Sequence, residues 1–235
     1  MPFLPLKSNL PDVKIGAWKI EEDELYFMER VKLYEHEWQR LAKIVHPEKR
    51  LEWLSSRLCL KELIKISNEE RVESLNTETG KPYLSNNSHF ISYTHSTGYA
   101  AAVASPRVEV GIDIEYLKRT RNQRTRFLFM NDEELDYFHA NESFELFILI
   151  WSSKESLYKI SGPGFAFKHN IALDFTNFQL RDNGKVTAYV HKDDIFRTYE
   201  VSYYIHPEFL LTYTCDSLPA EALPSPAGTE YSISG

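Results

Sequence analysis

The segment VGIDIE, Val110 to Glu115, alternates apolar residues with glycine and acidic residues. Because alternate residues of a strand point to opposite faces, its two isoleucines would share one face, and Gly111, Asp113 and Glu115 the other. The isoleucine face is suited to a protein core. The other face carries two carboxylates, which would repel each other unless water, a cation or basic side chains separate or neutralise them.

The rest of the first half alternates helix and strand patterns. We expect a strand near 13–20, a helix opened by acidic residues 21–24 and continuing through 34–44, an amphipathic helix from about 48 to 67, a turn at 79–84 that enters an extended segment, and two strands in HFISYTHS and YAAAVAS. His46-Pro47 separates the two helices, because proline disfavours helical backbone at the preceding residue. Ser96-Thr97-Gly98 would connect the two strands.

The second half shows the same mixture of patterns. We expect one helix starting near 131–134, another covering about 142–161, a hairpin around Asn183-Gly184 within FQLRDNGKVTAYV, and strands near 198–205 and 210–215. Gly162-Pro163-Gly164 is a strong helix stop. Helices combined with antiparallel strands in both halves predict an α+β fold. No internal repeat is strong enough to establish a duplication.

These elements divide the chain into two expected halves and a tail. Residues 1–106 would form the N-terminal half, and residues 107–216 the C-terminal half. Residues 217–235 are rich in proline, alanine, serine and glycine, and we expect them to be disordered.

The composition is typical of a soluble protein, with 43% hydrophobic and 26% charged residues. No apolar run approaches the roughly 20 residues of a membrane helix, and the N-terminal sequence lacks the pattern of a secretory signal. Cys59 and Cys215 form no metal-binding or redox spacing. We therefore expect a cytoplasmic protein with no membrane contact.

The formal charge of −7 argues against a protein that coats nucleic acid, because that task needs net positive charge. The local exception is LKRTRNQRTR, which follows the acidic strand and contains five basic residues: Lys118, Arg119, Arg121, Arg124 and Arg126. A solvated basic face explains this stretch as well as a binding surface does.

Asp113 and Glu115 form the first group of residues with chemical potential. On a strand their side chains would leave the same face roughly 7 Å apart, so both could reach one hard cation such as Mg²⁺. A solvent-facing acidic pair on an edge strand is the alternative.

Two further groups add to this pair. Glu155 and Lys159, in WSSKESLYKISGPGF, are four residues apart and would be neighbours on a helix. A surface ion pair explains that spacing, but the preceding LFILIW is strongly apolar, and charges on a buried helix need partners or coordination. In SYTHSTG, hydroxyl groups and His95 at a strand end suit phosphate binding, although an ordinary Ser/Thr-rich turn has the same composition.

Taken together and in this order, the motifs resemble the 4′-phosphopantetheinyl transferases, specifically the larger, surfactin-synthetase-activating type. The resemblance covers roughly residues 55–167. Its most specific motifs are GIDIE and WSSKESLYK, and SSRLCLKEL, GKPYL and SYTHS fit weaker upstream motifs. It implies two similar α+β halves related by a pseudo-twofold axis, with coenzyme A in the cleft between them.

The resemblance also implies an activity and its residues. Such an enzyme transfers the phosphopantetheine arm of coenzyme A to a serine of an apo carrier protein, releases adenosine 3′,5′-bisphosphate and requires Mg²⁺. Asp113, Glu115 and Glu155 would hold the metal. The diphosphate would contact Lys159, His95 and Thr94, and the phosphoadenosine end would contact Arg57 and Lys81.

One position departs from the family, which usually has serine immediately before the histidine, where this chain has Thr94. Because the hydroxyl group is retained, we expect little loss. The general base is open between Glu115, Glu133, Glu134 and a metal-bound water, since FMNDEEL resembles the acidic segment of the family without fixing the position.

The basic stretch suggests a partner. Carrier proteins of this kind are acidic around the modified serine, and we expect Arg119, Arg121 and Arg124 to dock them, on an enzyme that is expected to be monomeric. The alternatives are a non-catalytic relative that binds coenzyme A or a carrier, and a Mg²⁺-dependent phosphodiesterase. The identity of the carrier does not follow from the sequence.

Overall fold

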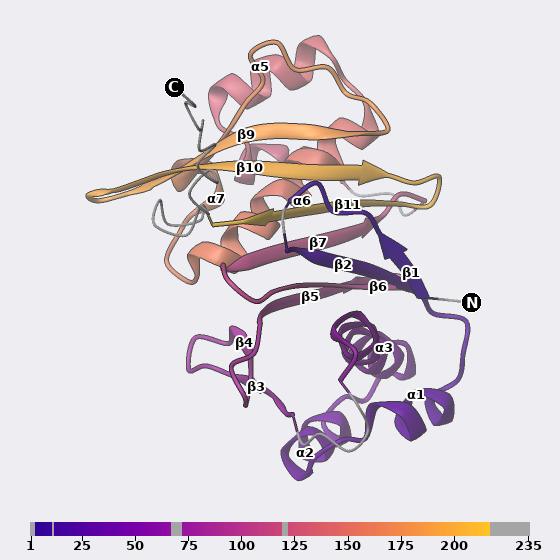
Figure 1. Cartoon of the computed structure of the whole chain (residues 1–235). Helices are drawn as coiled ribbons and strands as arrows, with labels where there is room; N and C mark the ends of the chain where they lie inside the picture. Colours follow the sequence, from indigo (N-terminus) through magenta and orange to yellow (C-terminus); the bar gives the residue numbers. More distant parts are fainter. Residues whose placement is uncertain (1–2, 11, 67–71, 119–121, 217–235) are drawn as a thin grey trace, which may run out of the picture.

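A computed structural model describes residues 3–10, 12–66, 72–118 and 122–216. In the first half, six antiparallel strands form one sheet in the order β1-β2-β6-β5-β4-β3 (Figure 1). Its elements are β1 (Phe3–Leu6), β2 (Lys14–Lys19), α1 (Glu24–Val31), α2 (Glu35–Ala42), α3 (Pro47–Ile64), β3 (Ser74–Asn76), β4 (Pro82–Leu84), β5 (Phe90–Ser96) and β6 (Tyr99–Ser105).

The second half contains a five-stranded antiparallel sheet in the order β7-β11-β10-β9-β8. Its elements are β7 (Val110–Tyr116), the 3₁₀ helix η1 (Gln123–Thr125), α4 (Arg126–Phe129), α5 (Asp132–Ala140), α6 (Phe144–Ser161), α7 (Phe167–Asn170), β8 (Ile171–Asp174), β9 (Asn183–Lys192), β10 (Ile195–Ile205) and β11 (Phe209–Cys215). This architecture confirms the predicted α+β class.

Three hydrophobic clusters hold the elements together. In β6, Ala100 and Ala102 pack with α3, whereas Ala101 and Val103 belong to a second cluster shared with β7 and β11. A third cluster joins α6 to the other face of the second sheet. The two sheets therefore pack against each other, with α3 on the outer face of the first sheet and α6 on the outer face of the second. At the junction, β7 lies next to β5 and β6 (Figure 1).

The strand prediction for β7 is confirmed in detail. Ile112 and Ile114 lie in the cluster between the sheets. On the opposite face, Gly111 lies against α6, where an added Cβ would collide with the backbone carbonyl oxygen of Ser156. Asp113 and Glu115 therefore leave the strand on the side of α6, as alternation requires.

Two sequence predictions are wrong. The single helix expected from 21–24 through 34–44 is divided, because Lys32 adopts a left-handed conformation (φ 53°) that ends α1, and a capping box between Tyr34 and Glu37 starts α2. The hairpin expected at Asn183-Gly184 lies elsewhere. These residues begin β9 opposite Tyr204 and Tyr203, and the chain reverses between Lys192 and Ile195. The reversal uses Asp193 at φ 52°, a conformation that aspartate tolerates better than most residues.

Other expectations stay predictions. Each half places an 18-residue helix against its sheet, but the pseudo-twofold axis and the boundary between residues 106 and 107 are not established. The expected disordered tail, 217–235, and Arg119 and Arg121 lie outside the described residues. Within the described ranges, every helix is too short or too polar to cross a lipid bilayer.

Small polar residues bring α6 close to the second sheet. The hydroxyl group of Ser156 lies 2.6 Å from that of Thr212 on β11, and Ser152 is 2.9 Å from the same threonine hydroxyl. Gly111 on the neighbouring strand provides the space into which the Ser156 carbonyl projects. The absence of a side chain at this position therefore sets how closely α6 approaches β7.

We predict that Gly111→Ala lowers the free energy of unfolding by about 1–3 kcal/mol or more, because overpacking forces the helix away from the strand. Gly16→Ala is the matched control, since its Cβ would meet only side-chain atoms, chiefly the ring of Phe3, which can move. Urea unfolding of both variants measures the difference. Equal losses would contradict the role assigned to the contact between Gly111 and α6.

Candidate functional site

A cavity of about 380 Å³ lies where the two halves meet. It is lined by residues from α2, α3 and β5 of the first half and from β7 and α6 of the second: Arg40, Trp53, Ser56, Arg57, Tyr93, Thr94, His95, Asp113, Glu115, Trp151, Glu155 and Lys159. The structure thus gathers at one cavity all the residues predicted for the site except Lys81.

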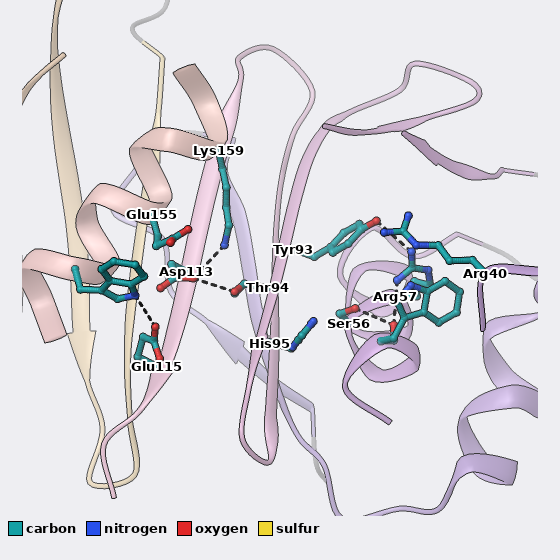
Figure 2. A pocket seen from close by; sticks show the side chains of 12 residues that line it. Arg40, Ser56, Arg57, Tyr93, Thr94, His95, Asp113, Glu115, Glu155 and Lys159 are labelled. Carbon is teal, nitrogen blue, oxygen red and sulfur yellow. Dashed lines mark hydrogen bonds and ion pairs between the residues drawn. The ribbon is translucent and has the colours of Figure 1, made fainter. Parts of the chain in front are cut away.

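Residues from both halves of the chain hold the carboxylate of Asp113. Its Oδ1 accepts hydrogen bonds from Thr94 Oγ1 on β5 (3.0 Å) and from Lys159 Nζ on α6 (3.0 Å) (Figure 2). Lys159 also donates to the backbone carbonyl of Ile112 (2.6 Å). The second oxygen, Oδ2, is buried and has no hydrogen-bond partner among the described residues. One oxygen thus fixes the carboxylate, and the other is left to accept a ligand.

Two further carboxylates lie at the same end of the cavity. Glu115 is 9% exposed, and its Oε1 accepts a hydrogen bond from the indole N–H of Trp151 (2.8 Å). Glu155 lies beside Asp113 and Lys159 (Figure 2). The ring of Trp151 contacts Phe129 edge-on, with centroids 5.2 Å apart, so the partner of Glu115 is itself fixed by packing.

These carboxylates are chemically suited to a hard cation, and the unpartnered Asp113 Oδ2 supplies a buried oxygen ligand. However, the described part of the chain contains no group of three or more His, Cys, Asp or Glu side chains placed so as to hold a metal ion. The ammonium group of Lys159 supplies positive charge at Asp113 instead. Metal binding by all three carboxylates therefore stays a prediction.

The opposite side of the cavity carries cations and aromatic rings. The guanidinium of buried Arg57 lies 3.4 Å from the centre of the Trp53 ring, and its Nη2 donates to the hydroxyl of Tyr93 (3.3 Å). Arg57 also pairs with Glu37 (3.3 Å). Arg40 and Ser56 complete this side (Figure 2). A fixed cation between aromatic rings suits an anionic ligand that also carries a flat ring.

Three residues predicted or considered for the site lie elsewhere. Lys81 pairs with Glu109 (2.7 Å) and is not among the cavity-lining residues. Neither Glu133, which is exposed, nor Glu134, which is fully buried, lines the cavity. Of the acids considered as the general base, only Glu115 does.

Glu134 belongs to a buried structural cluster instead. Its Oε2 lies 2.7 Å from Lys154 Nζ, and its carboxylate also accepts from the backbone N–H groups of Asn131 and Leu173. Burial raises the pKa of Glu134 and lowers that of Lys154, and the pairing opposes both shifts. Lys154 donates to three backbone carbonyls as well, those of Phe129, Phe167 and Ile171.

Five lining residues were not predicted from the sequence: Arg40, Trp53, Ser56, Tyr93 and Trp151. Trp53 could have been found from its position one helical turn before Arg57, and Tyr93 and Trp151 from the motifs that contain them. None of the recognised motifs contains Arg40. The helix that presents it was also expected to be longer and continuous.

Comparison with known proteins agrees with this geometry. Residues 109–214 match the model of the 4′-phosphopantetheinyl transferase superfamily. The chain is 30% identical over 131 residues to the 4′-phosphopantetheinyl transferase ffp of Bacillus subtilis, covering 53% of this chain and 56% of that protein. A second 4′-phosphopantetheinyl transferase of Bacillus subtilis is 29% identical over 130 residues, covering 52% and 55%. The match therefore spans little more than half the length of these relatives.

We predict that Lys154→Met lowers the free energy of unfolding by about 3–5 kcal/mol, because it leaves the Glu134 carboxylate buried without its counter-ion. Lys168→Met is the control, since Lys168 forms only a long contact (3.8 Å) with the exposed Asp132 and should cost about 0–1 kcal/mol. Urea unfolding distinguishes them. A loss in Lys154→Met no larger than in the control would contradict the structural role of the buried pair.

Proposed function

From the match of residues 109–214 to the model of the 4′-phosphopantetheinyl transferase superfamily, we propose that the chain transfers the phosphopantetheine arm of coenzyme A to a serine of an apo carrier protein. The products are the holo-carrier and adenosine 3′,5′-bisphosphate. The observation that supports this most strongly is the cavity between the halves, which has three carboxylates and Lys159 on one side and two arginines with aromatic rings on the other. A ligand with a diphosphate and a phosphorylated nucleoside matches both sides.

Asp113, Glu115 and Glu155 are the residues that would hold Mg²⁺. Bound there, the ion would offset negative charge that develops on the diphosphate oxygens during transfer. The buried, unpartnered Oδ2 of Asp113 supports this choice. Thr94 holds Oδ1 of the same carboxylate and so positions Asp113, and it lines the cavity where the proposed diphosphate contact would form.

The remaining roles follow from the charges along the cavity. In the proposed reaction the serine oxygen attacks the β-phosphorus, the bond between β-phosphorus and bridging oxygen breaks, and the bisphosphate leaves with that oxygen. Lys159 would move from Asp113 to the diphosphate, with His95 as a second contact, and Arg57 would contact the phosphoadenosine end. Lys81 is proposed for that end as well, although this requires it to leave Glu109. Glu115 is the candidate within the cavity for accepting the serine proton.

Further features belong to the same proposal. They are the surfactin-synthetase-activating type, two halves meeting near residue 106 and related by a pseudo-twofold axis, a monomeric state and a cytoplasmic location. Each is supported by the family resemblance, and the arrangement of one long helix on each sheet agrees with the two halves.

Intact-mass analysis with coenzyme A, Mg²⁺ and a broad panel of apo carrier proteins tests the function. We expect one or more carriers to gain the mass of one phosphopantetheine. Release of adenosine 3′,5′-bisphosphate without a modified carrier would favour a phosphodiesterase. Binding of coenzyme A without either product would favour a non-catalytic relative.

We predict that Asp113→Ala and excess chelator each remove most of the transfer activity, because each prevents Mg²⁺ from binding in the cavity and contacting the diphosphate. The variant should remain folded, since Lys159, which loses Asp113 as a partner, is partly exposed and still donates to the backbone carbonyl of Ile112. The measurements are turnover and circular dichroism, with Asp132→Ala, an exposed acid outside the cavity, as the control. Full activity in Asp113→Ala would contradict the metal assignment.

The proposed carrier-docking surface contains Arg119, Arg121 and Arg124, of which Arg124 is described and exposed. Arg124→Glu should raise the Michaelis constant for the carrier several-fold and leave that for coenzyme A unchanged, because it reverses charge on a steering surface. Added salt should weaken the carrier interaction of the parent more than that of the variant. Lys7→Glu is the control, because Lys7 is exposed, follows β1, and undergoes the same reversal of charge. Loss of coenzyme A affinity in Arg124→Glu would show that the surface serves the nucleotide instead.

A further inference from the structure

Glu52 is a buried acid on α3 that contacts the cavity only through another residue. It is 5% exposed and does not line the cavity. Its Oε2 lies 2.9 Å from Nδ1 of His95, the β5 residue that does line the cavity and whose side chain is 37% exposed. The same oxygen accepts a hydrogen bond from Lys49 Nζ (2.6 Å), one turn earlier on α3.

These contacts keep Glu52 ionised. Burial by itself would raise the pKa of its carboxyl group, but the hydrogen bonds from His95 and Lys49 outweigh burial, and the net shift is downward. An ionised carboxylate can only accept hydrogen bonds. The contact with His95 therefore requires the ring to carry a hydrogen on Nδ1.

That requirement fixes how His95 meets the cavity. With Nδ1–H engaged by Glu52, the nitrogen that remains for a ligand is Nε2, and the ring cannot turn over without losing the bond. When the ring carries both hydrogens, Nε2–H is a charged donor, suited to an anionic oxygen. The charge of Glu52 balances that form from behind the ring. The charged side chains that line the same cavity are Arg40, Arg57, Asp113, Glu115, Glu155 and Lys159.

We propose that Glu52 is a positioning residue that holds the Nδ1–H of His95, so that an Nε2–H of the same ring is directed to donate to a phosphate oxygen of the ligand. The inference rests on the proposed function, because it takes that ligand to be coenzyme A. Lys49 has a supporting part, since its ammonium group donates to the same Oε2 of Glu52 that contacts His95.

A double-mutant cycle on the full chain tests the proposal. Calorimetry would measure the affinity for coenzyme A and for adenosine 3′,5′-bisphosphate in wild type, Glu52→Leu, His95→Ala and the double variant. We expect each single substitution to weaken binding of coenzyme A about tenfold, and the double variant to bind no more weakly than His95→Ala. Glu52→Gln should retain an intermediate affinity, because the amide oxygen can still accept from Nδ1–H. Glu48→Gln, on the exposed side of the same helix, should bind as wild type does.

Imidazole ¹⁵N spectra provide a readout that does not depend on the ligand. In wild type, Nδ1 of His95 should carry a hydrogen, and this signature should change in Glu52→Leu. Additive losses in the cycle, or unchanged affinity in Glu52→Leu, would overturn the proposal. Failure of the wild type to bind coenzyme A would refute the proposed function, whereas a His95 ring without a hydrogen on Nδ1 would refute the positioning role of Glu52 itself.

Discussion

The close contact between Gly111 and the Ser156 carbonyl is the constraint on which the site depends. It sets the separation of β7 and α6, and both elements carry residues of the acidic side of the cavity. Asp113 is two residues beyond Gly111 on the strand, and Glu155 precedes Ser156 on the helix. The spacing of the strand that carries Asp113 and the helix that carries Lys159 is therefore set by backbone packing. A side chain at residue 111 would push α6, with Glu155 and Lys159, away from β7, which carries Asp113 and Glu115.

The cavity has its carboxylates and its arginines on different sides. Carboxylates lie on the side of the second half, and Arg40 and Arg57 on the side of the first, with His95 on the strand between them (Figure 2). Three charged side chains around the cavity have partners inside the protein: Asp113 pairs with Lys159, Arg57 with Glu37, and Glu52 with Lys49 and the ring of His95. Buried charges must be compensated in this way, or the fold would lose stability. A ligand in the cavity would exchange some of these pairs for its own charges.

The sequence was sufficient where a local pattern determines the outcome. Alternation in VGIDIE correctly predicted which face of β7 carries Asp113 and Glu115, and the motifs indicated the superfamily whose model matches residues 109–214. Tertiary effects decided the rest. The break at Lys32 depends on a left-handed residue within a helix-like pattern, and the turn signal at Asn183-Gly184 was overridden by pairing with β10. Glu134, which sequence similarity made a candidate base, is bound to Lys154, a partner 20 positions away that no local spacing indicates.

The four contacts of Lys154 have a consequence for the way the cavity can change its width. This residue joins α6 to α4, α7 and β8 through backbone carbonyls, and Glu155 follows it directly in the chain. Because α6 is tied to three neighbours and to the second sheet, it can neither slide nor rotate without breaking buried polar contacts. The acidic wall is thus the stationary one. Any change in width would fall to Arg40 on α2, whose side chain donates to Asn76 (2.8 Å) on the short strand β3. The cavity would then adapt its shape at Arg40, while the carboxylates stay in place on the rigid side.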